Sequence, residues 1–179
     1  MMIEHPFPRI IINPMQINII SAIIVYNLMT SAALLFVIWK NPRFMMGDYP
    51  EEITAGLSPQ SPEEKKGART YGLPFLLSLM LLPFFYGLLG KFSASLPFLK
   101  NATNIFILLF SFNLVDLLII DWIVFCTITP HFLVLPGTEG HPGYKNYRFH
   151  LDASFKGTLY ALCASFLFAS MIELAYFLL

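Results

Sequence analysis

The sequence contains few charged side chains and few cysteines. Charged residues make up 12% of its 179 residues and hydrophobic residues 56%, whereas soluble proteins average about 25% and about 45 to 50%. This scarcity of charge excludes an ordinary soluble domain and indicates an integral membrane protein. The two cysteines, Cys126 and Cys163, both lie in apolar runs. We therefore expect buried thiols and no disulfide framework.

An excess of charge of one sign is also missing, because eleven Lys and Arg side chains balance eleven Asp and Glu side chains. A neutral chain has no overall basic field, so nucleic acid is not an expected partner. The apolar segments differ in length and polar content, which argues against the inverted repeats of many transporters. Residues 1–16 lack the positive region and cleavage site of a secretory signal. We expect them to form an external or interfacial arm.

Four long apolar runs are present in the chain. A helix that crosses a bilayer needs about 20 apolar residues, and each run approaches or exceeds that length. The sequence therefore predicts an all-α membrane protein, with residues 1–179 forming a single integral membrane domain. The expected spans are 17–39, 72–89, 103–128 and 157–179, and the two large polar loops, 40–71 and 136–156, lie on one face of the membrane.

Local signals refine this outline. Ser61, Pro62 and Glu64 match a capping box with proline at the first helical position, which predicts a helix start inside the first loop. Pro83 lies near the middle of span 72–89 and predicts a kink, because its ring removes a backbone hydrogen bond.

The distribution of basic residues predicts the orientation. Cytoplasmic loops of membrane proteins are enriched in Lys and Arg. The large loops hold eight such residues, Lys40, Arg43, Lys65, Lys66, Arg69, Lys145, Arg148 and Lys156, whereas the other face holds Arg9, Lys91 and Lys100. We therefore expect a multi-pass protein of the cell membrane with cytoplasmic large loops and external termini.

Asp116 lies thirteen residues into span 103–128, or about 20 Å along a straight helix. A charged side chain at this depth costs about 2.5 to 3.5 kcal/mol on insertion scales, so such residues normally face the bundle, pair or lose their charge. No expected span contains a Lys, Arg or His side chain. Asn113 is the nearest candidate partner, because residues three apart share a helix face.

Asp121 follows Asp116 by five residues, which in an α-helix places the two side chains about 140° apart. We therefore expect no carboxylate pair, and we assign Asn113, Asp116 and Asp121 to an inward polar stripe. Asp116 is either a proton or cation site or a hydrogen-bonded packing device that sets helix register. Glu173 lies near the external end of the last span and is expected to be interfacial.

Three histidines, His131, His141 and His150, lie in or beside the second loop. Their wide spacing resembles neither a helical pair of ligands nor the close pairs of zinc motifs. We expect solvated or interfacial histidines, with a metal site only as the alternative, and we predict no cofactor.

The second loop also offers groups for a lipid headgroup. The turn containing Gly137 and Gly140 can present backbone amides, and Lys145 and Arg148 supply cationic donors. Generic anchoring at the membrane surface is the alternative explanation of the same residues.

Several segments together resemble an uncharacterised family of small bacterial integral membrane proteins. The resemblance implies four helices and no known activity. It rests on Asp48-Tyr49-Pro50, the Pro-Glu-Glu-Lys run at 62–65, Gly72 to Phe75, Asp121 to Thr127, Pro136 to Gly140 and Tyr144 to His150. His141-Pro142-Gly143-Tyr144 is also similar to the His-Pro-x-Tyr element of membrane-bound isoprenylcysteine and phospholipid methyltransferases, but the glutamate and cofactor-binding elements that follow it there are missing here.

Three classes of function remain open. The first is a non-enzymatic membrane protein that binds lipid, a small cation or a partner subunit through its polar stripe and loops. The second is a proton- or cation-coupled transporter component that uses Asp116, in an assembly of several copies. The third is a membrane enzyme acting at the inner surface through Asp48, Glu51, His141 or His150. The first class requires no catalytic constellation, and none is visible.

Overall fold

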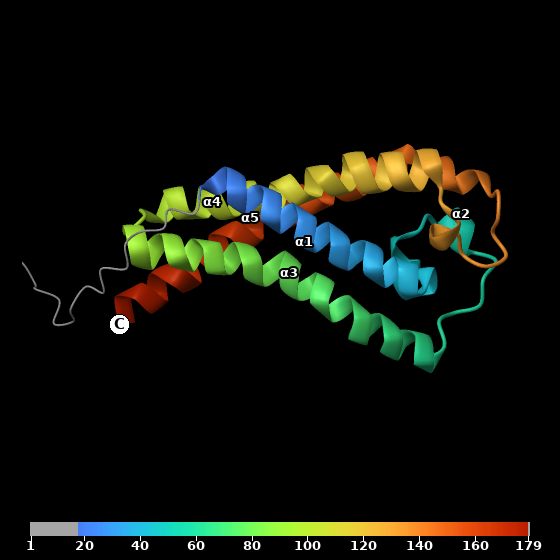
Figure 1. Ribbon diagram of the computed structural model, residues 1–179, viewed down its shortest axis with the longest axis horizontal. Coiled ribbons are helices and arrows are strands. Elements are labelled where there is room, and N and C mark those ends of the chain that lie inside the picture. Colours follow the sequence, from blue (N-terminus) through green and yellow to red (C-terminus); the bar gives the residue numbers. More distant parts are fainter. Residues whose placement is uncertain (1–17, 179) are drawn as a thin grey trace, which may run out of the picture.

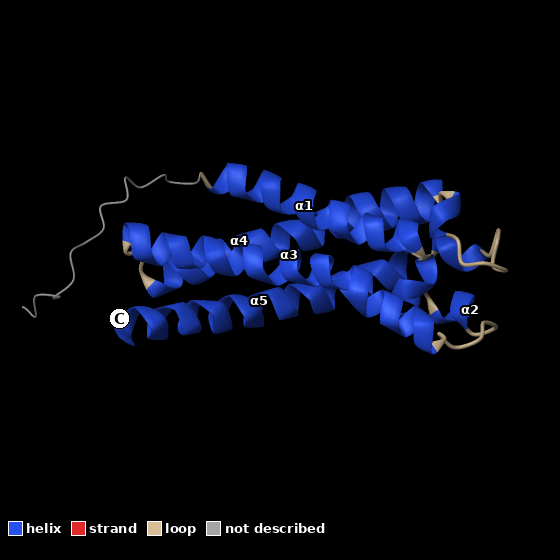
Figure 2. Cartoon of the chain, turned by 60° about the horizontal axis from the view of Figure 1, so that its bottom comes forward, coloured by secondary structure: helices blue, strands red, loops and turns tan. Residues whose placement is uncertain are grey.

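The computed structural model describes residues 18–178, and the expected arm at 1–16 lies outside them. The described chain is helical throughout its long elements and contains no strand (Figures 1 and 2). Four long rods run side by side. They are α1 (Ile19–Lys40), α3 (Pro62–Ala94), α4 (Phe98–Val115) with its continuation η2 (Asp116–Ile128), and α5 (Tyr147–Leu178).

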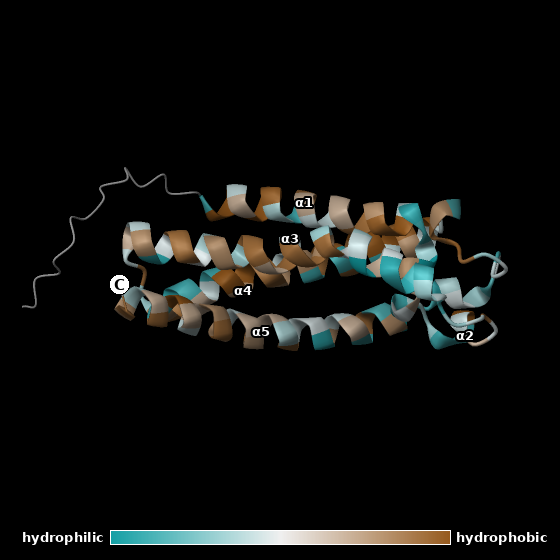
Figure 3. Ribbon diagram, turned by 90° about the horizontal axis from the view of Figure 1, so that it is seen from below, coloured by the Kyte–Doolittle hydropathy of each residue, from teal (hydrophilic) through white to brown (hydrophobic). Residues whose placement is uncertain are grey.

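All four rods are long and apolar enough to cross a membrane. Their outward faces carry large apolar side chains, such as Leu28 on α1 and Phe155 on α5, which are 67% and 68% exposed. Such a surface is stable in lipid, because exposing large apolar side chains to water is unfavourable in free energy. Figure 3 shows hydrophobic residues along the length of the rods and hydrophilic ones gathered at one end. The prediction of an all-α, multi-pass membrane protein is confirmed.

The two ends of the bundle differ. At the loop-bearing end, residues 41–61 and 129–146 connect the rods, whereas at the opposite end α1 begins, α5 ends and residues 95–97 join α3 to α4 (Figure 1). The predicted pair of large loops therefore lies on one face. These loops contain short helices, η1 (Pro42–Asp48), α2 (Glu51–Thr54), η3 (His131–Leu133) and η4 (Pro142–Lys145).

The last three rods are longer than the expected spans, whereas α1 closely matches span 17–39. The predicted capping box is present at the start of α3, where the Glu64 backbone N–H donates to Ser61 Oγ at 3.1 Å and the Ser61 N–H donates to Glu64 Oε2 at 2.8 Å. This helix continues through Pro83 to Ala94. Figure 1 shows that α3 bends along its length.

The second loop is also shorter than expected, because α5 begins at Tyr147 and includes residues 147–156. The side chain of Asn146 stabilises this start, since its Oδ1 accepts a hydrogen bond from the Phe149 backbone N–H at 3.1 Å. Asparagine is among the favoured residues for capping a helix N-terminus in this way. Residues 147–156 are therefore helical although they are polar, because α5 begins before its apolar run.

Close packing joins the rods in pairs. The helix α4 packs along α5, and α1 packs along α3. Gly87 in α3 permits close approach to α4, because a Cβ atom there would lie 2.5 Å from Ile105 Cδ1. One buried cluster includes Tyr26, Phe112 and Tyr144 and reaches the loop-bearing end, and a second surrounds Ile105 and Ile172.

Candidate functional site

The helix that carries the two intramembrane aspartates changes from α to π at Asp116. In a π-helix each N–H bonds to the carbonyl five residues earlier, which places one more residue in each turn. The end of η2 shows this spacing, because the Thr129 N–H donates to the Val124 carbonyl at 2.9 Å. Asp116 and Asp121 are therefore one π turn apart and share a face. The expectation that they diverge by about 140° is wrong, since it assumed α-helical geometry.

Side chains support the wide helix near its end. The Thr127 hydroxyl donates to the Trp122 carbonyl at 2.7 Å, again across five residues. Thr129 then adopts a left-handed conformation with φ of 49°, and Pro130 cannot supply a further N–H. Lys145 binds the terminus from outside, donating to the carbonyls of Cys126 and Thr127, the latter at 3.1 Å. Its cation complements the negative end of the helix.

His150 approaches Asp121 across the interface between α5 and η2. Its Nδ1 lies 3.1 Å from Asp121 Oδ1, and the histidine is only 4% exposed. The rings of Phe125 and Phe149 lie 4.8 and 5.2 Å from the imidazole, measured between centroids. Its Nε2 is buried without a hydrogen-bond partner in the described chain. This ring is thus fixed by packing and has one nitrogen directed to a carboxylate.

Two further carboxylates interact with this pair. Asp116 lies within electrostatic reach of Asp121 and Asp48, and Asp48 in turn lies within reach of Asp121 and His150. We call Asp48, Asp116, Asp121 and His150 the carboxylate–histidine cluster. Its members come from η1, η2 and α5, so the site exists only when the first loop packs against the third and fourth rods.

The environment of Asp48 favours its neutral form. Asp48 keeps an exposed surface, but surrounding protein atoms displace much of the water near its carboxyl group. This desolvation raises the pKa of Asp48, the charge of Asp121 raises it further, and His150 lowers it. The balance is a raised pKa, because desolvation is the largest of the three effects. Asp48 can therefore accept a proton more readily than an ordinary surface aspartate.

Asn113 belongs to the bundle interior but bonds away from Asp116. Its Nδ2 donates to the Ser154 carbonyl at 3.1 Å, to Ser154 Oγ at 3.0 Å and to Thr158 Oγ1 at 3.0 Å. No hydrogen bond joins Asn113 to Asp116 within residues 18–178. The expected pairing along one helix is replaced by a bond between α4 and α5, since Gly157 lets the two backbones approach closely there.

The candidate headgroup residues occupy separate places. Gly137 and Gly140 lie in exposed turns with φ of 85° and 75°, and the Gly137 N–H donates to Glu139 Oε1 at 3.2 Å. Lys145 directs its ammonium group to the end of η2, whereas Arg148 is exposed beside Asp152 at 3.7 Å. No hydrogen bond or ion pair connects these four candidates to one another in the described chain.

The other two histidines, His131 and His141, do not belong to the carboxylate–histidine cluster. His141 Nδ1 accepts the Gly143 N–H at 3.0 Å and caps η4, and His131 is exposed in η3. Over the described residues, no three His, Cys, Asp or Glu side chains are arranged to hold a metal ion. Of these three histidines, His150 is the one that lies within ion-pair distance of a carboxylate in the described chain.

The sequence does not predict the pairing of Asp121 with His150, because hydropathy assigns His150 to a loop. The available signal was Asn146, a favoured N-cap residue, whose recognition would have placed His150 in the first turn of a helix. The ion pair of Lys91 and Glu173, at 2.8 Å, escapes prediction for the same reason. Hydropathy assigns Lys91 to a connector, but α3 extends past it.

The fold and the cluster define a class, a small all-α multi-pass membrane protein with a carboxylate–histidine cluster at the loop-bearing end of its helices. Comparisons with protein-family models, with curated proteins and with solved structures find no match to this chain.

Proposed function

We propose that this membrane protein takes up and releases a proton through the carboxylate–histidine cluster. The observation that carries the proposal is the contact of 3.1 Å between His150 Nδ1 and Asp121 Oδ1, with two more carboxylates in electrostatic reach. Histidine changes its charge near neutral pH more readily than other side chains. A proton is the simplest of the small cations that an intramembrane polar site of this kind would bind.

The balance of charge supports proton binding. The cluster contains three carboxyl groups and one imidazole, so even a charged imidazole cannot neutralise three carboxylates. Lys145, which binds the end of η2, directs its ammonium group to backbone carbonyls and the Thr129 hydroxyl. Uncompensated like charges in a desolvated site are strongly unfavourable. We therefore expect at least one carboxyl group of the cluster to hold a proton at neutral pH.

The location suggests where the proton comes from. Asp48 combines an exposed surface with a place in the cluster, so it offers a route between the deeper Asp116 and the water beyond the loops. We propose that the loop-bearing end faces the cytoplasm, on the basis of the eight basic residues counted there. The proton would then exchange with the cytoplasm.

Infrared difference spectroscopy tests this proposal directly. The purified protein in lipid nanodiscs is stepped between acid and neutral pH, and the C=O stretch of protonated carboxyl groups is recorded. We expect Asp116→Asn to remove part of that band and His150→Gln to shift its pH dependence. Asp152→Asn, an exposed aspartate with 59% of its side chain accessible, serves as the control. A difference spectrum that is unchanged in Asp116→Asn would contradict the proposal.

A second candidate is a proton-coupled transporter component that uses Asp116. Two separate polar contacts lie further along the bundle: Asn113 Nδ2 donates to Ser154 Oγ at 3.0 Å, and Asn27 Nδ2 donates to Ser111 Oγ at 2.8 Å. Four rods enclose little volume, so this function would require several copies or a partner membrane subunit. Proton flux into liposomes that is lost in Asp116→Asn, with normal folding and assembly, would favour it over simple binding.

A further inference from the structure

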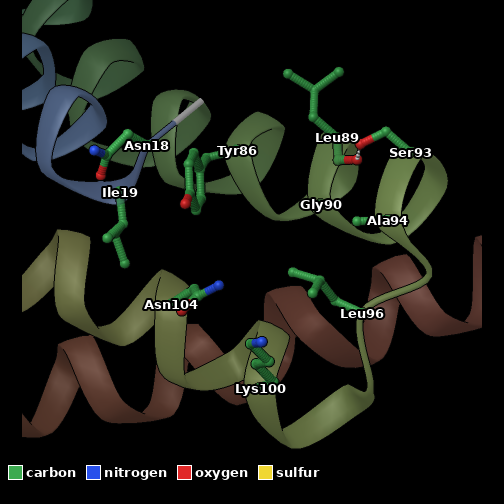
Figure 4. Close-up of a pocket in the computed structure, with 10 residues that line it drawn as sticks. All are labelled: Asn18, Ile19, Tyr86, Leu89, Gly90, Ser93, Ala94, Leu96, Lys100 and Asn104. Atoms are coloured by element: carbon green, nitrogen blue, oxygen red, sulfur yellow. Dashed lines mark hydrogen bonds between the residues drawn. The ribbon is translucent and has the colours of Figure 1, made fainter. Parts of the chain in front are cut away.

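A cavity opens at the end of the bundle opposite the carboxylate–histidine cluster. It has a volume of about 440 Å³ and lies between the start of α1, the last turns of α3 and the first turns of α4 (Figure 4). This volume is within the range of about 300 to 1,000 Å³ that small-molecule sites occupy. The cavity takes no part in the proton site, because none of the residues of that cluster lines it.

Two polar side chains of α4 point into this cavity. Lys100 and Asn104 are four residues apart and therefore share one helix face, and Figure 4 shows the ammonium and amide groups directed into the space below Tyr86. Neither has a hydrogen-bond or ion-pair partner in the part of the chain that the structure describes. By contrast, Ser93 Oγ already donates to the Leu89 carbonyl at 2.5 Å, and Asn18 caps the Ile20 N–H. Lys100 and Asn104 are thus the available donors.

The charge of the cavity lining favours an anion. Among the described residues that line the cavity, Lys100 is the only charged one, and none is Asp or Glu. The starts of α1 and α4 both lie at this end, and neither first turn contains an acidic residue that would offset the positive end of the helix dipole. The nearby Lys91 is neutralised by Glu173 at 2.8 Å. Carbonyls at the end of α3 are occupied by the N–H groups of Ser95 and Leu96.

The cavity also provides an apolar wall beside its cation. Ile19, Leu89 and Leu96 contribute this wall, and the cavity lies where α3 ends and α4 begins, at the level at which a spanning helix leaves the hydrocarbon region. A phospholipid places its phosphate at that level and its acyl chains along the apolar side. We propose that the cavity is a binding site for the phosphate headgroup of an anionic phospholipid, held by Lys100 and Asn104.

Native mass spectrometry of the full chain in detergent micelles tests this site. The protein is titrated with dioleoyl phosphatidylglycerol, and retained lipid is counted against dioleoyl phosphatidylcholine. We expect one phosphatidylglycerol molecule to bind preferentially and Lys100→Gln to weaken that binding about tenfold, the effect of losing a charged hydrogen bond. Lys66→Gln removes an exposed positive charge at the start of α3, at the end of the bundle opposite the cavity, and should leave the affinity for phosphatidylglycerol unchanged.

A second variant separates the cavity from the charge. Ala94→Phe leaves Lys100 in place but fills space in the lining at the exposed end of α3, so it should also reduce phosphatidylglycerol binding. Equal losses in Lys100→Gln and Lys66→Gln, full binding by Ala94→Phe, or equal retention of phosphatidylcholine would each overturn the proposal. Displacement of the lipid by inorganic phosphate at comparable concentration would overturn the lipid assignment in favour of free phosphate. Circular dichroism of each variant establishes that it folds.

Discussion

Single polar side chains hold the loop-bearing end together. Arg43 in η1 binds Glu64 in α3 at 2.5 Å, Tyr49 donates its hydroxyl to the Leu133 carbonyl at 2.8 Å, and the Leu135 N–H donates to the Tyr144 hydroxyl at 2.8 Å. The contacts of Tyr49 and Leu135 are buried, and a buried polar group left without its partner costs about 1 to 3 kcal/mol. The loops are therefore a packed part of the fold and bring Asp48 to its site.

The pKa of Asp48 predicts how stability changes with pH. The pKa of Asp48 in the folded protein lies above the ordinary value of 3.8. Between the unfolded and the folded pKa of Asp48, the folded protein therefore binds more protons than the unfolded chain. The free energy of unfolding should therefore fall with rising pH there. Thermal unfolding in detergent should show this decrease weakened in Asp48→Asn.

Glu64 provides a control of opposite sign for that measurement. The hydrogen bond from Arg43 lowers the pKa of Glu64, and the Ser61 N–H lowers it further. The stabilisation from Glu64 is present above its unfolded pKa and is lost as pH falls through the folded value. Glu64→Gln should accordingly reduce stability at neutral pH more than in acid. The same trend in both variants would contradict the assignment for Asp48.

Lys145 gives a second prediction for a single residue. Replacement by Met keeps the length of the side chain but removes the donors to Cys126 O, Thr127 O and Thr129 Oγ1. We expect Lys145→Met to destabilise the protein by about 1 to 3 kcal/mol, since the last carbonyls of η2 lose their cation. The control Lys156→Met changes an exposed lysine on α5 and should have little effect. Thermal unfolding measures both, and equal shifts would show that the end of η2 does not depend on Lys145.

At the scale of elements, the carboxylate–histidine cluster depends on a change of helix type at Asp116. An α-helix over 116–128 would turn Asp121 away from Asp116, whereas the π-helix places both on one face, within electrostatic reach of Asp48 in η1. π-helical turns are rare and occur frequently at functional sites. The polar cluster and the unusual helix coincide in this protein, which supports a functional reason for the helix.

The contact between α4 and α5 gives a prediction at the same scale. A Cβ atom at Gly157 would lie 2.5 Å from Asn113 Oδ1, so Gly157→Ala must displace Asn113 and weaken its three hydrogen bonds to α5. We expect a loss of about 1 to 3 kcal/mol in stability. Gly72→Ala is the matched control, because that helical glycine has nothing within 4 Å of an added Cβ. It should stabilise α3 by up to about 1 kcal/mol. Similar thermal shifts for both variants would argue against close packing at Gly157.

At the scale of the whole molecule, the two ends of the bundle have different chemistry. The loop-bearing end gathers carboxylates and a histidine, and the opposite end contains the Lys91–Glu173 pair and the cavity beside Lys100. Between the two ends, the outward surfaces of the four rods are apolar. This arrangement requires that both large loops share one side of the membrane and that residues 95–97 lie on the other.

Cysteine labelling checks this arrangement. In a Cys163→Ser background, Ser58→Cys and Glu139→Cys should react with a membrane-impermeant maleimide from the same side, which the distribution of basic residues predicts to be cytoplasmic. Ser95→Cys should react only from the opposite side. Labelling of Ser58→Cys and Glu139→Cys from different sides would contradict the fold, whereas labelling of both from outside would reverse only the predicted orientation.

Much of the outline could be predicted from local patterns. The capping box at Ser61 and the end of the third rod at Ile128 follow from neighbouring residues, and hydropathy locates each rod. The site could be predicted only in part. Asp116 stands out in the sequence because a carboxylate at that depth is costly. Asp48, which lies within its electrostatic reach, and His150, which pairs with Asp121, come from segments that hydropathy assigns to loops.

The sequence by itself determined the class of the protein, the number of rods and the placing of both large loops at one end of the bundle, because these depend on run length and composition. Tertiary structure alone decided which polar groups meet. It did so through the π-helix that aligns Asp116 with Asp121, the start of α5 that brings His150 to Asp121, and the packing of η1 that adds Asp48. Such meetings depend on contacts between distant segments, and no local pattern encodes them.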